Sequence, residues 1–392
     1  YRSGVAGTRD MTEYRITAGF IPLTDSLLLV VAREKGFAAA EGVDLTLVRE
    51  ISWANIRDRV AVGQFDVAHM LTPMPIAASL GLSPIDVPVI AVMGLNLGGN
   101  AVTVSAELWA AMEAAGAPGD FDPAGVGAAL RMVVTSRKTR LKLGVVHPYS
   151  SHNYELRYWL AASGIHPDRD VELMIVPPPL MADALAAERI DGFCVGEPWG
   201  SVAVAAGAGR IATVKARLWP HSPEKVLGVT EAWAAAHPEA LAALLRGLHG
   251  AAIWCGDPAN HAEAAALLAR PDYLGLPAEL IARGLSGNLA QAPGREVPVA
   301  DFFIPHDHAA NLPDPADALW YYSQMVRWGD VPASPERLAI AARAYRPELY
   351  QAVAGGERPI GRSGGWFDGV RFDAEGLDAY AEMLRQRDLL IA

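Results

Sequence analysis

The chain has 392 residues, of which 51% are hydrophobic and 20% are charged, with a formal net charge of −11. This composition predicts a folded globular protein, and the length suggests two domains, possibly with an extension. The negative charge and the lack of a basic run argue against nucleic acid or an anionic membrane surface as partner. A small anion is still compatible as a ligand, because a local cation and oriented amides decide its binding.

The two cysteines, Cys194 and Cys255, are too few for a disulfide framework and lie in apolar contexts, which is typical of buried free thiols. No apolar run of about 18 residues predicts a membrane-spanning helix. Residues 1–11 contain no apolar core of a secretory signal, and Met11 is a plausible natural start. We therefore expect a cytoplasmic protein; the alternative is a periplasmic protein whose signal has been removed.

Strand-like and helix-like segments alternate in the N-terminal part. Alternating or apolar runs predict strands at 14–20, 43–48 and 65–70, and helical spacing predicts helices at 27–37 and 53–62. The same order returns later, with strands at 143–146, 171–176 and 190–195 and helices at 153–162 and 180–188. Residues 63–70 (GQFDVAHM) and 187–198 (AERIDGFCVGEP) correspond as helix end, Asp, then buried strand.

Two βαβαβ units predict an α/β fold with two lobes, in which ligands bind at the carboxyl ends of the parallel strands. We assign residues 12–105 to the first part of lobe 1 and 106–225 to lobe 2. Residues 226–392 return to lobe 1 and add a C-terminal helical extension. The facing strand ends of the two lobes would form the ligand cleft.

The turn at 147–153 (HPYSSHN) lies between a strand and a helix. The first amide N–H groups of a helix lack partners and carry partial positive charge, which favours an anion. Ser150 or Ser151 could equally be a simple N-cap. Because the strand-turn-helix arrangement repeats in both lobes, we keep an anion site at this turn as a hypothesis, and it includes His152.

Further candidates stand at predicted strand ends and crossovers. Trp53 starts a helix, where its indole N–H could face the cleft or its ring could fill the core. Gly98, Gly99 and Asn100 form a turn at a lobe crossover, where paired glycines allow close backbone approach. Pro178 lies in the rigid run 177–179. Lys225 lies at the return crossover and could be solvated or reach an anion.

Three other features favour structural interpretations. His69 ends a buried strand and is better explained as a satisfied interior histidine. Glu197 could orient a cation or cap the following helix. His306, Asp307 and His308 resemble metal-ligand spacing only loosely, and we interpret them as a loop feature, so no metal site is predicted.

Several segments together resemble the nitrate- and bicarbonate-binding proteins of ABC transporters, over most of residues 14–330. They are GFIPLTDS (19–26), SWANIRDRVAVGQFDVAHMLTPMP (52–75), RYWLAASGI (157–165), DGFCVGEPW (191–199) and PEKVLGV (223–229). The resemblance implies a C-shaped, two-lobed, type II periplasmic-binding fold with the ligand between the lobes. It also implies ligand contacts from Trp53, the Gly98–Asn100 turn, His152, Pro178 and Lys225.

The residue at position 225 bears on the ligand. Bicarbonate binders of this family tend to carry an acidic residue there and use calcium, so Lys225 implies nitrate, with nitrite close behind, and no cofactor. Nitrate is a planar monoanion that offers only acceptors, so we expect surroundings made of donors. Asn100 departs from the Gln expected at its position.

The predicted cytoplasmic location makes the chain similar to the soluble nitrate or nitrite sensors of this family, which control nitrate-assimilation genes. They hold an RNA-binding antiterminator of the ANTAR type inactive until the anion binds, and do not contact nucleic acid themselves. The alternative is the solute-binding receptor of a nitrate/nitrite ABC transporter. An enzyme related to thiamine-pyrimidine synthesis, using Cys194 with His147 or His152, is the third interpretation and is disfavoured because Cys194 lies in an apolar strand.

Overall fold

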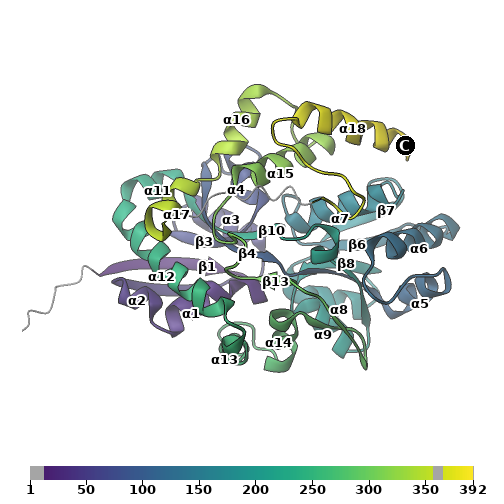
Figure 1. Cartoon of the computed structure of the whole chain (residues 1–392), viewed down its shortest axis with the longest axis horizontal. Coiled ribbons are helices and arrows are strands. Elements are labelled where there is room, and N and C mark those ends of the chain that lie inside the picture. Colours follow the sequence, from purple (N-terminus) through teal and green to yellow (C-terminus); the bar gives the residue numbers. More distant parts are fainter. Residues whose placement is uncertain (1–12, 356–364, 392) are drawn as a thin grey trace, which may run out of the picture.

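The computed structural model describes residues 13–355 and 365–391. Met11, the proposed natural start, lies outside the described residues. Two separate mixed sheets lie side by side with helices on their faces, as Figure 1 shows. This arrangement confirms the predicted α/β class. No helix in the described part of the chain is long and apolar enough to cross a membrane.

The first sheet has six strands in the order β13-β4-β10-β3-β1-β2. Its strands are β1 (Tyr14–Phe20), β2 (Val43–Arg49), β3 (Val67–Leu71), β4 (Val89–Gly98), β10 (Pro223–Thr230) and β13 (Phe303–Ile304). The second sheet has five strands in the order β7-β6-β8-β5-β9. Its strands are β5 (Asn100–Ser105), β6 (Leu141–Val145), β7 (Val171–Ile175), β8 (Gly192–Gly196) and β9 (Gly209–Val214); β11 (Asn288–Ala292) and β12 (Arg295–Pro298) form a separate hairpin.

The predicted internal repeat is present in both sheets. β1 pairs in parallel with β2 and β3, and β6 pairs in parallel with β7 and β8. The aspartates of the two matching sequence segments make the same bond: Asp66 Oδ2 accepts the Thr17 N–H at 2.8 Å, and Asp191 Oδ2 accepts the Lys142 N–H at 2.7 Å. The sequence correspondence therefore reflects equivalent positions in two βαβαβ units.

Helices cover both sheets. Around the first sheet lie α1 (Leu27–Glu34), α2 (Phe37–Ala40), α3 (Trp53–Ala61), α4 (Pro73–Ser79), α11 (Glu231–Ala236), α12 (Pro238–Gly256), α13 (His261–Leu268) and α17 (Pro347–Ala354). Around the second lie α5 (Ala106–Ala114), α6 (Pro123–Ser136), α7 (Ser151–Ala162), α8 (Met181–Ala186), α9 (Trp199–Ala205) and α10 (Lys215–Leu218), and α14 (Ala278–Ser286) contacts α9. α11 ends before Pro238, which cannot donate an amide and instead begins α12.

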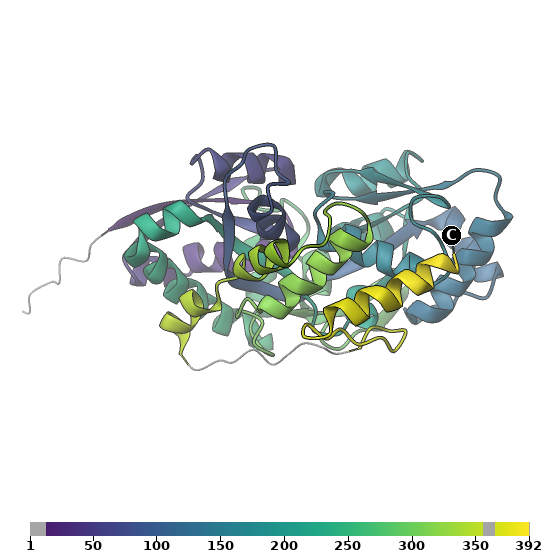
Figure 2. The same cartoon turned by 90° about the horizontal axis from the view of Figure 1, so that it is seen from above.

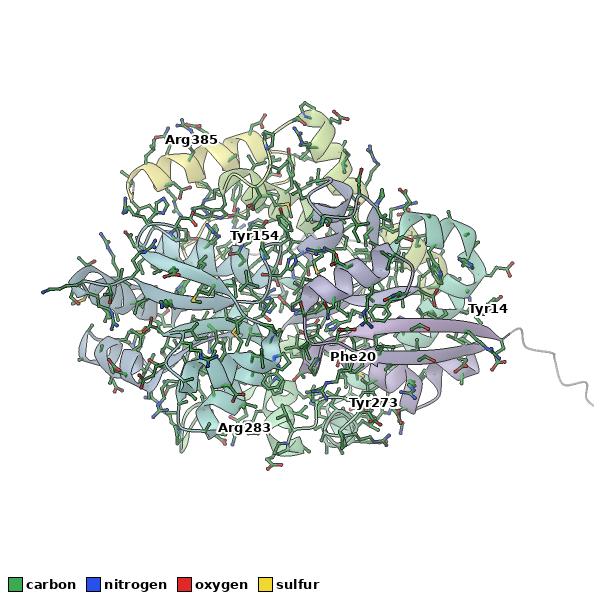
Figure 3. The ribbon with its side chains drawn as sticks, turned by 180° about the vertical axis from the view of Figure 1, so that it is seen from behind. Tyr14, Phe20, Tyr154, Tyr273, Arg283 and Arg385 are labelled. Carbon is green, nitrogen blue, oxygen red and sulfur yellow. The ribbon has the colours of Figure 1, made fainter. Side chains whose placement is uncertain are left out.

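The C-terminal helices join the two halves of the molecule. They are α15 (Pro315–Arg327), α16 (Pro335–Arg343) and α18 (Leu377–Leu389). α15 packs against α4 on one side and α7 on the other, and α18 packs on α15, as the view from above shows (Figure 2). Tyr154 of α7, labelled in Figure 3, donates a hydrogen bond of 2.8 Å to Asp330, just beyond α15.

Buried apolar residues form two large clusters. One includes residues of α3, α4, α7 and α15, and the other includes residues of α1, α12 and α13. Trp53, Trp159 and Trp320 belong to the first cluster and are fully buried. Both clusters contain residues from both sheets, so the two halves share apolar packing as well as the polar contacts described below.

The chain crosses between the sheets at Gly98 and Gly99. β4 ends at Gly98 in the first sheet, whereas β5 begins at Asn100 and pairs with β8 and β9. The predicted boundary after residue 105 is therefore one strand too late. The apolar runs on both sides of the paired glycines look alike in sequence, and only strand pairing assigns each to its sheet. The Gly99 N–H donates to the Phe302 carbonyl at 2.6 Å.

We expect Gly98→Ala to destabilise the protein by about 2–4 kcal/mol. Gly98 has a φ of +68°, and an added Cβ would lie 2.2 Å from the Phe302 carbonyl oxygen. The variant would therefore lose stability for two reasons, the strain of a left-handed backbone and the clash with the Phe302 carbonyl. Urea unfolding of the purified variant measures the loss.

The matched control is Gly63→Ala. Gly63 has a φ of +73° with nothing within 4 Å of an added Cβ, so it carries the strain alone, at about 1 kcal/mol. Equal losses in the two variants would show that the Phe302 segment does not press on Gly98.

Candidate functional site

Glu224 and Lys225 of β10 both direct buried side chains into the contact between the two sheets. Successive side chains on a regular strand point to opposite faces. Here the pairing of β10 with β4 shifts register on both sides of Lys225, and a bulge of this kind re-aims side chains. The irregularity explains why two neighbours in sequence share one site.

The Glu224 carboxylate is the centre of a polar cluster. It accepts hydrogen bonds from Asn100 Nδ2 at 2.6 Å and from Ser151 Oγ at 2.7 Å, both from the second half of the molecule. It also contacts the ammonium groups of Lys215 and Lys225. Burial alone would raise the pKa of Glu224, but the two lysines hold it well below the usual value. Glu224 is therefore ionised and ties the two sheets together.

Lys225 has partners from the first half. Its Nζ lies 2.8 Å from Asp25 Oδ2 and 2.5 Å from Glu224 Oε1, and 5.6 Å from the centre of the Trp53 ring. Burial would lower the pKa of Lys225, but the carboxylates of Asp25 and Glu224 raise it overall. His69 Nε2 lies 2.9 Å from the other Asp25 oxygen. A charged ammonium thus sits beside an indole and between two carboxylates.

His152 enters the cluster from the start of α7. Ser150 is the N-cap of this helix, with its Oγ accepting the Asn153 N–H at 3.0 Å, so the simple N-cap interpretation holds for that residue. His152 Nε2 lies 3.3 Å from Glu224 Oε1. Burial lowers the pKa of His152 to about 3 despite the nearby carboxylate. The imidazole is therefore neutral near pH 7 and has one N–H to donate.

The charges of the cluster balance. The ammonium groups of Lys215 and Lys225 face the carboxylates of Asp25 and Glu224, whose pKa values are both lowered. Burial raises the pKa of the remaining acid, Glu155, which lies 2.7 Å from Lys215 and accepts from the Tyr321 hydroxyl at 3.1 Å. An added monoanion would therefore leave a buried excess of negative charge unless a proton accompanied it.

Buried N–H groups of Trp53 and His152 make no hydrogen bond. Trp53 Nε1 and the ring nitrogens of His152 have no hydrogen-bond partner among the described residues, because the 3.3 Å approach of His152 Nε2 to Glu224 Oε1 lacks hydrogen-bond geometry. Buried polar groups are usually paired, and leaving one unpaired costs about 1–3 kcal/mol. Asn100 Oδ1, a buried acceptor, is also without a partner in the described part of the chain. These atoms are the positions in the cluster at which a small polar ligand would find free hydrogen-bonding groups.

The structure brings together four of the predicted site residues and leaves three outside the polar cluster. Trp53, Asn100, His152 and Lys225 belong to the cluster. Gly98 and Gly99 supply the crossing next to Asn100. Pro178 is buried at the start of the 3₁₀ helix η2 (Pro178–Leu180), after β7, and has no polar side-chain atom to contribute to these bonds.

The expectation of surroundings made only of donors is wrong. Asp25 and Glu224 press against Lys225, and the Asn100 amide is already bonded to Glu224. The interpretation of Lys225 as solvated is also wrong, because its side chain is fully buried. A lysine withdrawn this far from water requires counter-charges, and the sequence pattern alone did not identify them.

Sequence reasoning missed four members of the cluster: Asp25, Glu155, Lys215 and Glu224. Asp25 lies after β1 in η1 (Thr24–Ser26), at a position that corresponds to the Ser151 turn after β6. That equivalence was the available signal for it. His69 is interior, as expected, and accepts the Ile21 N–H at 3.4 Å.

Two further alternatives are resolved near the site. Glu197 accepts the Ser201 N–H at 3.3 Å from both oxygens and so caps α9. Burial raises the pKa of Glu197 to about 7. Burial also raises the pKa of the Cys194 thiol well above its usual value, so Cys194 stays protonated and is unsuited to act as a nucleophile.

Comparison with known proteins places this geometry in a family. Residues 10–269 match the model of the NMT1-like family. The nitrate/nitrite binding protein NrtA of Synechococcus elongatus is 34% identical over 403 residues, covering 98% of this chain and 89% of the relative. The nitrate import ATP-binding protein NrtC of Synechocystis is 36% identical over 88% of this chain, and this chain spans 50% of its length.

Solved structures agree. The periplasmic nitrate-binding protein NrtA from Synechocystis matches with a TM-score of 0.86 at 29% identity, covering 95% of this chain and 98% of that chain. The alkanesulfonate-binding protein SsuA from Xanthomonas axonopodis pv. citri matches at 16% identity with a TM-score of 0.57, which supports the fold alone. The expected two-lobed periplasmic-binding fold is thus confirmed, and the chain belongs to the NMT1-like family, among the nitrate- and bicarbonate-binding proteins of ABC transporters.

Proposed function

We propose that this protein is a non-enzymatic receptor that binds nitrate, with nitrite as a close second, between its two sheets. The observation that supports this most is the buried Lys225 ammonium in a cluster with two N–H donors, on Trp53 and His152, that make no hydrogen bond among the described residues. Nitrate offers acceptors on every oxygen and one negative charge, which matches this set. The printed function of the NrtA relatives supports the same ligand.

Bicarbonate is the second candidate, because the cluster also holds acceptors. The O–H of bicarbonate could donate to Asn100 Oδ1, which has no partner in the described structure, or to the carboxylate of Asp25. Nitrate cannot make such a bond. Calorimetric titration with nitrate, nitrite, bicarbonate and sulfate separates these ligands. If only bicarbonate binds, bicarbonate and not nitrate is the ligand. If none of the four anions binds, the proposed function is wrong.

The relatives named above are transport proteins, which favours a transporter receptor over the cytoplasmic sensor expected first. A sensor would need an antiterminator partner of the ANTAR type, and the two ligands would weaken each other's binding by the same factor. Co-purification with such a partner, followed by release with nitrate, distinguishes the two roles. We expect no such complex; a nitrate-released complex would restore the sensor.

Trp53→Phe should weaken nitrate binding. It should not lower the stability of the fold through loss of a hydrogen bond, because the indole N–H makes none in the described structure. The substitution keeps a ring beside Lys225 and removes only Nε1–H, which has no acceptor among the described residues. Hydrogen bonds to charged groups contribute about 1.5–3 kcal/mol, so we expect affinity to fall roughly 10- to 150-fold. Calorimetry measures the affinity and urea unfolding the stability.

Trp366→Phe is the matched control, since Trp366 Nε1 is also buried without a partner in the described chain, among the rings of Tyr158, Trp219 and Trp320. Its nitrate affinity should equal that of the parent protein. Unchanged affinity in Trp53→Phe would remove the indole from the proposed site.

Nitrate binding should take up protons. Asp25 and Glu224 already balance the charges of the two lysines, so a buried nitrate would raise the pKa of nearby acids. Glu155 should be protonated first, because burial already raises its pKa. The complex then holds more protons than the free protein, and linkage requires affinity to rise as pH falls, by at most about tenfold per pH unit for one proton.

Calorimetric titrations of the protein with nitrate, in buffers of different ionisation enthalpy, measure the number of protons taken up on binding. Glu155→Gln, which removes the titrating group, should flatten the pH dependence of the affinity. If the nitrate affinity of the parent protein does not change between pH 6 and 8, binding involves no proton uptake and this prediction is wrong.

A further inference from the structure

Three metal-binding side chains meet on the surface beside the chain crossing. The ligand atoms of His221, Asp301 and His308 all lie within 4.8 Å of one another. His221 Nε2 lies 3.1 Å from Asp301 Oδ2, and the rings of His221 and His308 stack with centroids 4.0 Å apart. The residues come from two separate segments, one before β10 and one on either side of β13.

The position of these side chains does not follow from the local sequence. His306 and His308 flank Asp307 in an HDH run, but His306 Nδ1 pairs with Asn311 Oδ1 at 2.9 Å. His308 instead joins His221, 87 positions earlier by number, and Asp301. His221, Asp301 and His308 have φ values of +54°, +54° and +58°. All three ligands thus stand at positions with left-handed backbone, which is uncommon for residues other than glycine.

We propose that His221, Asp301 and His308 form a site for a divalent transition metal of the zinc type. Two imidazoles and one carboxylate, with a position left to solvent, are a donor set suited to Zn²⁺ and not to Mg²⁺ or Ca²⁺, which prefer oxygen. Tetrahedral coordination needs ligand atoms roughly 3.3 Å apart. The half-exposed side chains therefore need to approach one another by at most about 1.5 Å, which rotamer changes at an exposed site permit.

A metal at this site would join segments on both sides of the crossing. Ser222, next to His221, accepts the Gly98 N–H at 3.0 Å, and Phe302, next to Asp301, accepts the Gly99 N–H at 2.6 Å. Both glycines of the crossing are thus bonded to residues adjacent to metal ligands. Binding would hold β10 and β13 together at the point where the chain leaves the first sheet.

The test is titration of the purified protein with Zn²⁺ by calorimetry, with Co²⁺ absorption as a report on coordination geometry. We expect one ion per chain and a tetrahedral Co²⁺ spectrum. Asp301→Asn and His308→Asn should each weaken Zn²⁺ binding by about tenfold or more, equivalent to about 1.4 kcal/mol. Asn tolerates left-handed backbone, so both variants should fold, and circular dichroism checks this.

His306→Gln is the control, because Gln can still bond to Asn311 while the HDH run loses a histidine. Its Zn²⁺ affinity should match that of the parent. If His306→Gln weakens binding as much as His308→Asn, the ion binds the HDH run and not the proposed triad. Zn²⁺ binding unaffected by Asp301→Asn and His308→Asn, or no binding at all, would also overturn the proposal.

Discussion

The buried Glu224 carboxylate is the interaction on which the closed arrangement depends. It receives donors from Asn100, Ser151 and Lys215 in one half of the molecule and from Lys225 in its own strand. An ion in this position is stable only because every oxygen is paired, and removing one partner of a buried pair typically costs 3–5 kcal/mol. The halves are therefore held together by a buried charge whose partners come from both of them.

This constraint also shapes ligand binding. Under the proposed function, a small anion would enter a cluster in which each lysine already has a carboxylate, and it would compete with Asp25 and Glu224 for the same ammonium groups. Specificity would then depend on the neutral donors of Trp53 and His152 and on proton uptake. A ligand with a second charge would be rejected, because that charge would be buried without a partner.

The crossing links this cluster to the surface. Asn100 follows Gly99 directly, so the residue that donates to Glu224 is placed by a turn that is bonded to Ser222 and Phe302. Positive φ at both glycines lets the backbone pass close to the Phe302 segment. The His221, Asp301 and His308 triad lies on the same segments. A short, continuous path of backbone bonds therefore connects that surface to the polar cluster.

Local sequence was sufficient to predict the repeat, and the family resemblance named four residues that the structure places in the polar cluster. Hydrophobic periodicity and the Asp66 and Asp191 segments predicted two βαβαβ units, because these signals come from contacts close along the chain. Family resemblance located Trp53, Asn100, His152 and Lys225. The strand boundary at Gly99 was misjudged, because β4 and β5 are equally apolar and differ only in their pairing partners.

The sequence by itself determined the α/β class, the two repeated units and the strand ends at which polar residues gather. Only the tertiary structure decided that Asp25, Glu155, Lys215 and Glu224 surround the predicted lysine, and that His308 joins His221 instead of His306. These groupings depend on a bulge in β10 and on segments far apart in the chain. Patterns along a sequence report local periodicity, whereas such contacts are set by packing between the two halves.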